Sequence, residues 1–301
     1  MHKRRIGNAM VSAIGLGGMP LSIEGRPDEE RAVATIHAAL DAGISFIDTA
    51  MSYCLNASET GHNESLIARA LAAYGGDTSA VLVGTKGGAA READGAWSFK
   101  GDPATLREAC EGSLRRLGVD AIGLYQLHVP DPNVPYADSV GALRDLYDAG
   151  KIRAVGISNV NSDQLREAHG ILGERLVSVQ NNFSPATRDS EPQLRLCAEL
   201  GIAFLPYSPL GGISRAGGLG SSHVAFARIA GERGVSPQQV CLAWELAKSP
   251  VVIPIPGSTR PTTVRDSAEA ADLKLTEAEF AELDAAWPTR GGGAAAPPPR
   301  A

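Results

Sequence analysis

Short apolar segments alternate with amphipathic segments along most of the chain. The apolar segments are runs rich in Val, Ile and Leu, as in "AVLVGTK" and "IRAVGISN", which indicates strands buried on both faces. The amphipathic segments repeat their apolar residues at the three- to four-residue spacing of a helix. The pattern predicts eight strand–helix units, each strand being followed by a helix, with strands at 12–18, 45–50, 80–86, 121–128, 152–159, 176–182, 202–209 and 251–258.

Strands that are buried on both faces and joined through helices form a parallel sheet, because the helical crossover returns each strand in the same direction. Eight such units match a closed barrel in number and length. We therefore expect an α/β fold, a (β/α)8 TIM barrel, as a single domain over residues 1–287. An open doubly wound sheet is the alternative, but "GLGGMP" after the first strand lacks the GxGxxG spacing of a dinucleotide-binding turn.

Three segments fall outside the repeating units. "RRIGNAMVSA" (4–13) contains a Gly-Asn turn and predicts an N-terminal β-hairpin across the barrel floor. "SPQQVCLAWELAKS" (236–249) begins with serine before proline and predicts an extra helix between units seven and eight. Residues 288–301 are rich in Gly, Ala and Pro, so we expect a low-complexity, mobile tail there.

Composition and charge narrow the function classes. The chain has 301 residues, 44% of them hydrophobic, and a formal net charge of -6, which argues against a broad nucleic-acid or acidic-membrane binder. No apolar run approaches the roughly 20 residues of a membrane-spanning helix, and we expect a cytoplasmic monomer or weak homo-oligomer. The four cysteines lack the paired spacing of a metal site or disulfide framework, so we expect no metal.

Four ionisable side chains stand at or just after the ends of neighbouring predicted strands. Asp48 ends the second strand, Lys86 the third and His128 the fourth, while Tyr53 lies in the loop directly after Asp48. The carboxyl ends of barrel strands form one rim, where the active sites of this architecture are built. We therefore expect the four side chains to meet at one mouth.

Each of these residues also has an ordinary structural explanation when taken singly. Asp48 could cap a turn, Lys86 could be a solvated charge, His128 a core histidine and Tyr53 a packed loop aromatic. Together they suggest chemistry, because an acid and a lysine on adjacent strand ends would form an ion pair beside a pocket. The charge of the lysine would favour the phenolate form of the nearby tyrosine and improve it as a proton donor or acceptor.

Such a group of residues suits the reduction of a carbonyl, which needs a proton on oxygen and a hydride on carbon. The histidine can hydrogen-bond and orient the reacting oxygen. No side chain donates hydride, so the interpretation requires a cofactor, and nicotinamide is the ordinary carrier.

The remaining strand ends supply groups suited to a nicotinamide dinucleotide. Ser158, Asn159 and Gln180 could hold a carboxamide, and Tyr207 offers a flat face for stacking. The Gly-rich loop that begins at residue 208 could approach a pyrophosphate, although a flexible linker would look the same.

A second anion site is predicted where the eighth unit turns into its helix. Gly257, Ser258 and Thr259 lead to the N-terminus of that helix, and the guanidinium of Arg260 could grip a 2′-phosphate. These residues favour NADPH over NADH.

These motifs, in this order, resemble the aldo-keto reductase superfamily over roughly residues 4 to 285. "DTAMSY", "TK" and "LH" are similar to the catalytic tetrad of that family, and "GISN", "VQNN", "PYSPLGG" and "IPIPGS" to its cofactor segments. The resemblance implies Tyr53 as general acid, Lys86 and Asp48 as the pair that tunes it, and His128 as the residue that orients the carbonyl. It extends the expected cofactor contacts to Gly18, Met19, Asp48, Ser208, Leu210, Asp266 and Ser267.

The chain departs from the family pattern at the eighth loop, where Thr263 replaces a basic residue found in many members, which leaves Arg260 as the expected phosphate partner. Substrate contacts are expected from Trp97 in the loop after the third strand and from Met19, beside Tyr53 and His128. The resemblance implies a small-molecule aldehyde or ketone as substrate.

Two further hypotheses compete with an NADPH-dependent carbonyl reductase. One is a nicotinamide-binding regulatory subunit with little turnover. The other is Schiff-base chemistry at Lys86, which the pairing with Asp48 disfavours because that acid would hold the amine charged.

Overall fold

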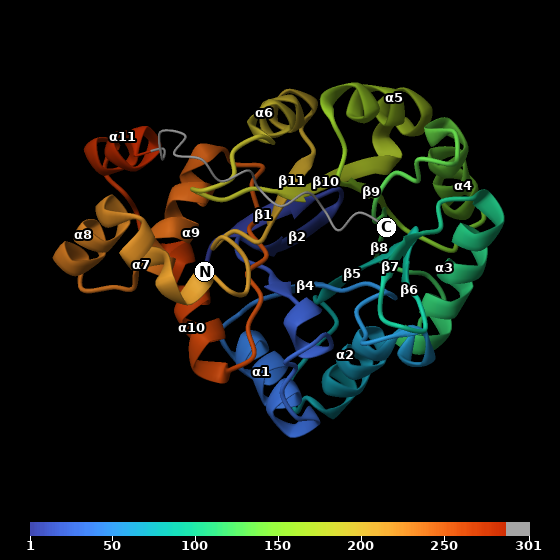
Figure 1. The fold of residues 1–301 in the computed structure, drawn as a ribbon, viewed down its shortest axis with the longest axis horizontal. Coiled ribbons are helices and arrows are strands. Elements are labelled where there is room, and N and C mark those ends of the chain that lie inside the picture. Colours follow the sequence, from blue (N-terminus) through green and yellow to red (C-terminus); the bar gives the residue numbers. More distant parts are fainter. Residues whose placement is uncertain (287–301) are drawn as a thin grey trace.

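A parallel seven-stranded sheet curls around the centre of the molecule in the computed structural model, which describes residues 1–286 (Figure 1). Neighbouring strands pair in chain order, and each is connected to the next through one or more helices. The strands are β3 (Leu16–Gly17), β4 (Phe46–Asp48), β5 (Leu82–Gly87), β8 (Leu124–Leu127), β9 (Val155–Ser158), β10 (Leu176–Asn182) and β11 (Ala203–Tyr207).

The expected eighth strand is an irregular segment rather than a regular strand. Pro254 and Pro256 carry no N–H, so this segment cannot donate at two positions of a ladder. It nevertheless closes the barrel: Ile253 N donates to Phe204 O at 2.8 Å, and Gly17 N donates to Pro256 O at 3.0 Å. Isolated parallel bridges join Phe204 to Val252 and Gly17 to Gly257. The (β/α)8 TIM barrel predicted from the sequence is therefore confirmed, with a proline-containing seam.

Helices surround the sheet as an outer ring (Figure 1). Those of the eight units are α1 (Glu29–Asp41), α2 (His62–Ala73), α3 (Pro103–Leu117), α4 (Tyr136–Asp148), α5 (Ser162–Leu172), α6 (Glu191–Leu200), α8 (Val224–Arg233) and α10 (Pro261–Glu269). The predicted extra helix is α9 (Pro237–Lys248), which begins where the hydroxyl of Ser236 accepts from Gln239 N.

Shorter elements complete the described chain. Two short helices that the sequence did not predict are α7 (Leu219–Ser222) and α11 (Glu277–Ala285). The 3-10 turns are η1 (Met19–Leu21), η2 (Ala57–Glu59), η3 (Gly173–Arg175), η4 (Ala216–Gly218) and η5 (Ala270–Asp272). Within residues 1–286, no helix is long and apolar enough to cross a membrane. The tail predicted at 288–301 lies outside the described residues.

The N-terminal hairpin closes one end of the barrel, as the Gly-Asn turn predicts. Strands β1 (Lys3–Ile6) and β2 (Ala9–Ser12) pair antiparallel around Gly7, whose φ of 56° is a left-handed conformation that favours glycine. Ile6 and Val11 are buried against side chains of the barrel interior such as Phe46.

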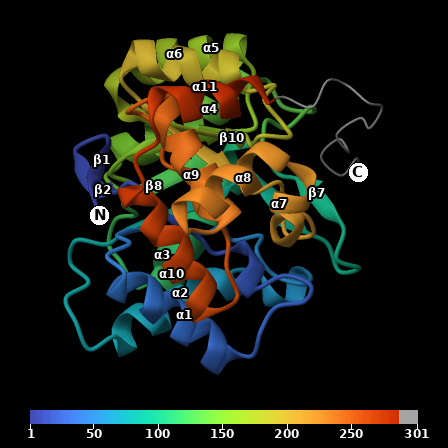
Figure 2. The same cartoon turned by 90° about the vertical axis from the view of Figure 1, so that its left-hand side faces the viewer.

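A second hairpin, β6 (Ala89–Arg91) and β7 (Trp97–Phe99), stands in the segment predicted as a loop after β5. Its register pairs Arg91 with Trp97 across the two strands. The two hairpins lie on opposite sides of the barrel (Figure 2). The end marked by the second hairpin is therefore open to a site, whereas the other is closed.

One acidic side chain in the core, that of Glu245, has no hydrogen-bond donors beside it among the described residues. Glu245 of α9 is fully buried, and neither of its carboxylate oxygens has a hydrogen-bond partner among the described residues. Burial raises the pKa of Glu245 well above its ordinary value, because a charge cannot be solvated there.

Replacing Glu245 with Gln should stabilise the protein increasingly as the pH rises. An unfolded glutamate ionises near pH 4.3, whereas the folded one stays protonated, so rising pH above that point favours the unfolded wild-type chain. We expect the difference in free energy of unfolding between the variant and the wild type to increase by more than about 1 kcal/mol from pH 4.5 to pH 8. Urea denaturation at the two pH values measures it. Glu108→Gln on the exposed face of α3 is the control, and an equal gain at both pH values would contradict the prediction.

Candidate active site

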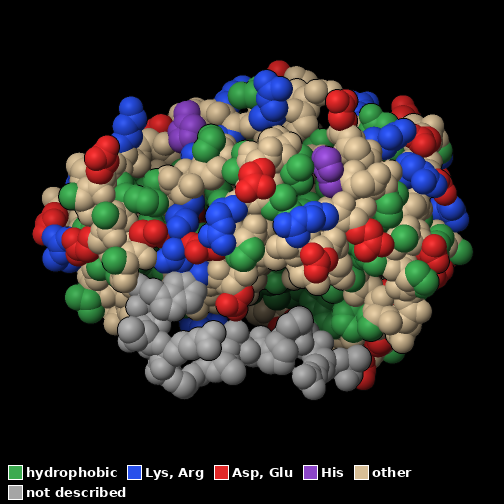
Figure 3. Space-filling view, turned by 90° about the horizontal axis from the view of Figure 1, so that it is seen from above, with side chains coloured by type: hydrophobic (Ala, Val, Ile, Leu, Met, Phe, Trp, Pro, Cys, Tyr) green, Lys and Arg blue, Asp and Glu red, His purple; other side chains and the backbone are tan. Residues whose placement is uncertain are grey.

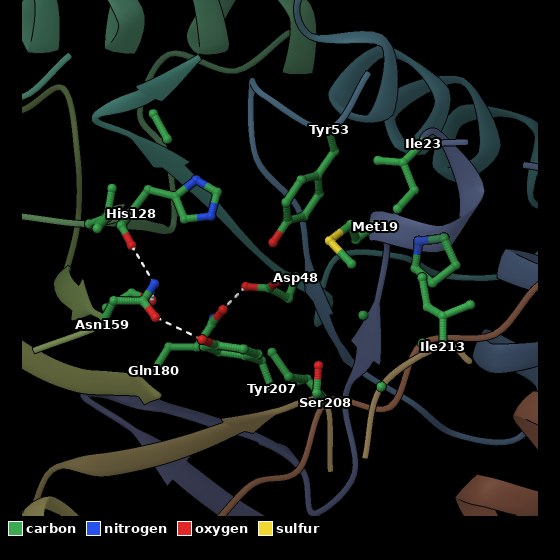
Figure 4. Close-up of a pocket in the computed structure, with 18 of the residues that line it drawn as sticks. Met19, Ile23, Asp48, Tyr53, His128, Asn159, Gln180, Tyr207, Ser208 and Ile213 are labelled. Atoms are coloured by element: carbon green, nitrogen blue, oxygen red, sulfur yellow. Dashed lines mark hydrogen bonds between the residues drawn. The ribbon is translucent and has the colours of Figure 1, made fainter. Parts of the chain in front are cut away.

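A cavity of about 410 Å³ opens at the carboxyl ends of the barrel strands. Figure 4 shows Tyr53 and His128 directed into it, with Met19 and Ile23 on one side and Gln180 on another. The face drawn in Figure 3 mixes acidic and basic side chains without a broad area of one sign. The site is thus a local pocket in a surface of mixed charge.

Lys86 is the central contact of this site. Its side chain is fully buried at the end of β5, and Nζ donates to Asp48 Oδ2 at 2.6 Å, to the carbonyl of Thr49 at 3.0 Å and to Tyr53 Oη at 2.9 Å. All three hydrogens of an ammonium group are therefore used. The structure brings together Asp48, Lys86 and Tyr53 as the sequence predicted, and it leaves the amine no free position for Schiff-base chemistry.

Asp48 is held by amide groups on its other side. Its Oδ1 accepts from Gln180 Nε2 at 2.7 Å and from Gln126 Nε2 at 3.3 Å, so both carboxylate oxygens are satisfied in the barrel interior. The sequence analysis missed Gln126. The signal was present, because Gln126 precedes His128 by two residues and the alternation of a strand puts both on one face.

The phenol of Tyr53 is neutral, and the expectation that it would favour the phenolate form is wrong. Burial raises the pKa of Tyr53 well above its ordinary value, and the negative charge of Asp48 raises it further. The ammonium of Lys86 is offset by the carboxylate next to it, so the pair offers little net positive charge to a phenolate. Since Tyr53 Oη accepts from Lys86, the hydroxyl hydrogen is free to point elsewhere.

His128 follows β8 and stands edge-on to Tyr53, with ring centroids 5.7 Å apart. Burial, with a contribution from the charge of Lys86, lowers the pKa of His128 to about 3, so the imidazole is neutral near pH 7. Nδ1 lies 3.3 Å from Ser52 Oγ, a partner that the sequence analysis missed although Ser52 directly precedes Tyr53. A neutral ring whose Nδ1 accepts from Ser52 carries its hydrogen on Nε2.

The predicted carboxamide-binding residues lie together on another wall of the cavity (Figure 4). Tyr207 Oη donates to Asn159 Oδ1 at 2.8 Å, and Asn159 Nδ2 donates to the carbonyl of His128 at 2.9 Å and to Ser158 Oγ at 3.1 Å. Asn159 and Ser208 have φ angles of 58° and 52°, a left-handed conformation that costs energy for residues other than glycine. Both strained residues line the cavity.

The remaining predicted cofactor residues divide into two groups. Some line the cavity, namely Met19, Ser208, Leu210 and Gly257. Gly18, Ser258, Thr259, Arg260, Asp266 and Ser267 are not among its lining residues. Gly18 is required by packing instead, because a Cβ there would lie 2.5 Å from Asn63 Oδ1.

The N-terminus of α10 presents the predicted phosphate partner. Arg260 is exposed at the N-cap position, and its backbone N–H donates to Ser258 Oγ at 3.2 Å. The carboxylate of Asp266 has other partners, since it accepts from Ser236 Oγ at 2.7 Å and from Gln239 Nε2 at 2.9 Å. Asp266 therefore fixes α9 to α10.

The outer part of the cavity is mainly apolar, with two charged residues. Met19, Trp97 and the 59% exposed Ile213 stand there with Pro20, Ile23 and Phe99. Arg91 and Glu24 also line the cavity and form an ion pair, which the sequence analysis did not predict. Within residues 1–286, no cluster of His, Cys, Asp and Glu suits a metal ion.

The chain is similar to enzymes of one family over nearly its whole length. The Aldo/keto reductase family model matches residues 13–288. An uncharacterized oxidoreductase of Schizosaccharomyces pombe is 35% identical over 284 residues, which cover 93% of this chain and 88% of that protein. A probable aldo-keto reductase of Glycine max is 33% identical over 306 residues, covering 92% of this chain and 86% of the relative.

Solved structures agree with this similarity. A glycerol dehydrogenase of Gluconobacter oxydans superposes with a TM-score of 0.81 at 28% identity, covering 99% of each chain. An aldo/keto reductase of Klebsiella pneumoniae, solved in complex with NADP and acetate, superposes with a TM-score of 0.80 at 27% identity, covering 97% of this chain and 98% of the other.

Replacing Lys86 with Met should lower the free energy of unfolding by about 3–5 kcal/mol, because Asp48 would remain buried without its counter-charge. The double variant Asp48→Asn with Lys86→Met should recover part of this loss, since neither position then buries a charge. Urea denaturation at neutral pH measures both. Lys100→Met removes a half-exposed ion pair with Glu92 and should change stability little. A double variant as unstable as the single one would contradict the prediction.

Proposed function

The chain belongs to the aldo/keto reductase family, and from this premise we propose that it reduces an aldehyde or ketone to the alcohol, with hydride from NADPH and a proton from Tyr53. The observation that carries the proposal is the Lys86 ammonium, which joins Asp48 and Tyr53 at the base of the cavity. The same reaction run backwards oxidises an alcohol.

The side chains present fit a nicotinamide dinucleotide. Ser158, Asn159 and Gln180 offer donors and acceptors for a carboxamide, and Tyr207 offers a ring face beside them. Arg260, exposed at the start of α10, would hold a 2′-phosphate, with Ser258 and Thr259 next to it. The complex of the Klebsiella pneumoniae relative with NADP supports this assignment.

The proton donor follows from the contacts of the phenol. The lone pair of Tyr53 Oη that faces Lys86 is occupied, so the O–H can point toward a carbonyl oxygen in the cavity. As the proton leaves, negative charge develops on Oη, and the hydrogen bond from Lys86 strengthens. NADPH, when bound, supplies the hydride.

His128 positions the reacting oxygen. Its neutral ring, held through Nδ1 by Ser52, can donate from Nε2 to the same carbonyl oxygen that receives the proton of Tyr53. Tyr53 is buried and His128 is partly buried, which limits the access of bulk water to that oxygen.

We further propose a cytoplasmic enzyme that acts on a small molecule as a monomer or weak homo-oligomer, without nucleic acid or membrane as partner. The net charge of -6 argues against nucleic acid or an acidic membrane as partner, and the local pocket suits a small molecule.

Replacing Tyr53 with Phe should lower kcat by about 10²–10⁴-fold, because the proton donor is lost, while NADPH binding stays within a few-fold. Steady-state kinetics with an aldehyde panel and titration of NADPH by fluorescence quenching measure the two effects. Tyr125→Phe is the matched control: this tyrosine is also buried, its hydroxyl has no partner among the described residues, and it does not line the cavity.

Retention of most activity in Tyr53→Phe would exclude that residue as the acid. If no aldehyde oxidises bound NADPH in the wild type, the regulatory-subunit hypothesis replaces the reductase.

The kcat/KM for carbonyl reduction should show no ionisation of His128 between pH 5 and 8. Its lowered pKa of about 3 means that the neutral donor is present throughout this range and is lost only at more acidic pH. The pH profiles of the wild type and of His128→Gln measure this. A change of kcat/KM with an apparent pKa near 6.5 in the wild type, absent from His128→Gln, would contradict the prediction.

A further inference from the structure

A single cationic side chain lines the cavity. Among the lining residues in the described part of the chain, Arg91 is the one arginine or lysine, and it is about nine-tenths buried. The proposed reduction gives it no task, because proton transfer uses Tyr53 and Lys86. A buried guanidinium in a mainly apolar cavity requires an anionic partner.

The hairpin of β6 and β7 fixes the guanidinium at a defined place. Arg91 and Trp97 are cross-strand partners, and Arg91 Cζ lies 4.8 Å from the centroid of the indole. The same indole meets the ring of His128 edge-on, with centroids 6.2 Å apart. The guanidinium and the imidazole that would donate to the carbonyl oxygen therefore both adjoin the same indole ring.

The anionic partner of Arg91 in this structure, Glu24, is much more exposed than Arg91 itself. In the ion pair with Glu24, the arginine side chain is 5% exposed and the glutamate side chain 63% exposed. Glu24 is therefore largely hydrated already, and losing the contact would cost it little. Arg91 would need another anion in its place.

The pairing also leaves at least one buried donor of the guanidinium without an acceptor. Nη2 donates to Glu24 Oε1 and, at 3.2 Å, to the carbonyl of Leu55, whereas the buried Nε–H has no partner among the described residues. A carboxylate or phosphate can accept from two adjacent guanidinium N–H groups at once. An anion spanning Nη2 and Nε would satisfy a donor that Glu24 leaves unused.

The segment that carries Glu24 does not depend on the Arg91 contact. Arg26, two residues further on, holds it through two hydrogen bonds to Glu59, of 2.8 and 3.0 Å. Glu24 can therefore release Arg91 while the segment stays attached to the barrel.

We propose that Arg91 binds an anionic group of the substrate, a carboxylate or a phosphate. In the absence of substrate, Glu24 pairs with the guanidinium, and the substrate anion displaces it. The substrate class is an aldehyde or ketone whose anion and carbonyl are about an aromatic ring's length apart, because Arg91 and His128 both adjoin the indole of Trp97. The proposal rests on the proposed function, since it places the carbonyl at Tyr53 and His128.

The test compares matched aldehydes that differ in charge. The probes are 4-formylbenzoate, 4-formylphenyl phosphate and the neutral 4-methylbenzaldehyde, assayed with NADPH in the wild type, Arg91→Gln and Glu24→Gln. In Arg91→Gln we expect the kcat/KM ratio of anionic to neutral aldehyde to fall about 10- to 100-fold, mainly through KM. The two anionic probes show whether carboxylate or phosphate is preferred.

Glu24→Gln separates a binding role from a structural one. If Glu24 competes with the substrate anion, its removal should lower KM for the anionic aldehydes several-fold and raise the ratio. If the ion pair only supports the fold, both variants should shift the ratio equally or not at all, which would overturn the proposal. Arg69→Gln on α2, which removes an exposed ion pair with Glu29 of α1, is the matched control.

A binding measurement tests the role of Arg91 independently of whether the protein catalyses the proposed reaction. Calorimetric titration of 4-methylbenzoate should show weaker binding to Arg91→Gln and tighter binding to Glu24→Gln than to the wild type, whether or not any aldehyde is reduced. If Arg91→Gln does not fold, Arg91→Lys, which keeps the charge but not the two-pronged geometry, and Glu24→Gln serve instead. Equal affinities across the folded variants would overturn the proposal.

Discussion

The ion pair of Lys86 and Asp48 is the interaction around which the catalytic end of the barrel is built. Two charges without access to water are costly unless every donor and acceptor on them is satisfied. Here the ammonium uses all three hydrogens, and the carboxylate accepts from both Gln126 and Gln180. The position of the Tyr53 hydroxyl follows from this requirement, because it is the third acceptor that the ammonium needs.

The parallel barrel makes this arrangement possible with residues that are far apart in sequence. Asp48, Lys86 and Gln126 sit on three adjacent strands, β4, β5 and β8, and the register pairs Lys86 directly with Gln126. Each side chain needs only to be the right type at the end of its strand, since the ladder sets the distances. In the hairpin of β6 and β7, strand register likewise sets which side chains are neighbours, because it pairs Arg91 with Trp97.

The sequence predicted the barrel and the meeting of the four ionisable residues because both follow from regular periods and strand ends. It could not predict effects that depend on what surrounds a group. Tyr53 remains a neutral phenol because Asp48 offsets the charge of Lys86 and burial disfavours an anion. The Glu24 and Arg91 pair joins segments 67 residues apart and carries no local pattern.

The proline-containing seam gives the barrel one weak edge. On the β3 side of this segment, Gly15 N and Gly17 N donate to Pro254 O and Pro256 O, and the prolines cannot donate in return. This edge therefore has fewer hydrogen bonds than a full ladder and should open more easily. The same segment runs directly into Ser258 and Arg260. A dinucleotide bound by those residues would contact the segment at this edge and stabilise its closed form. Cofactor affinity and the free energy of opening the barrel would then be thermodynamically linked.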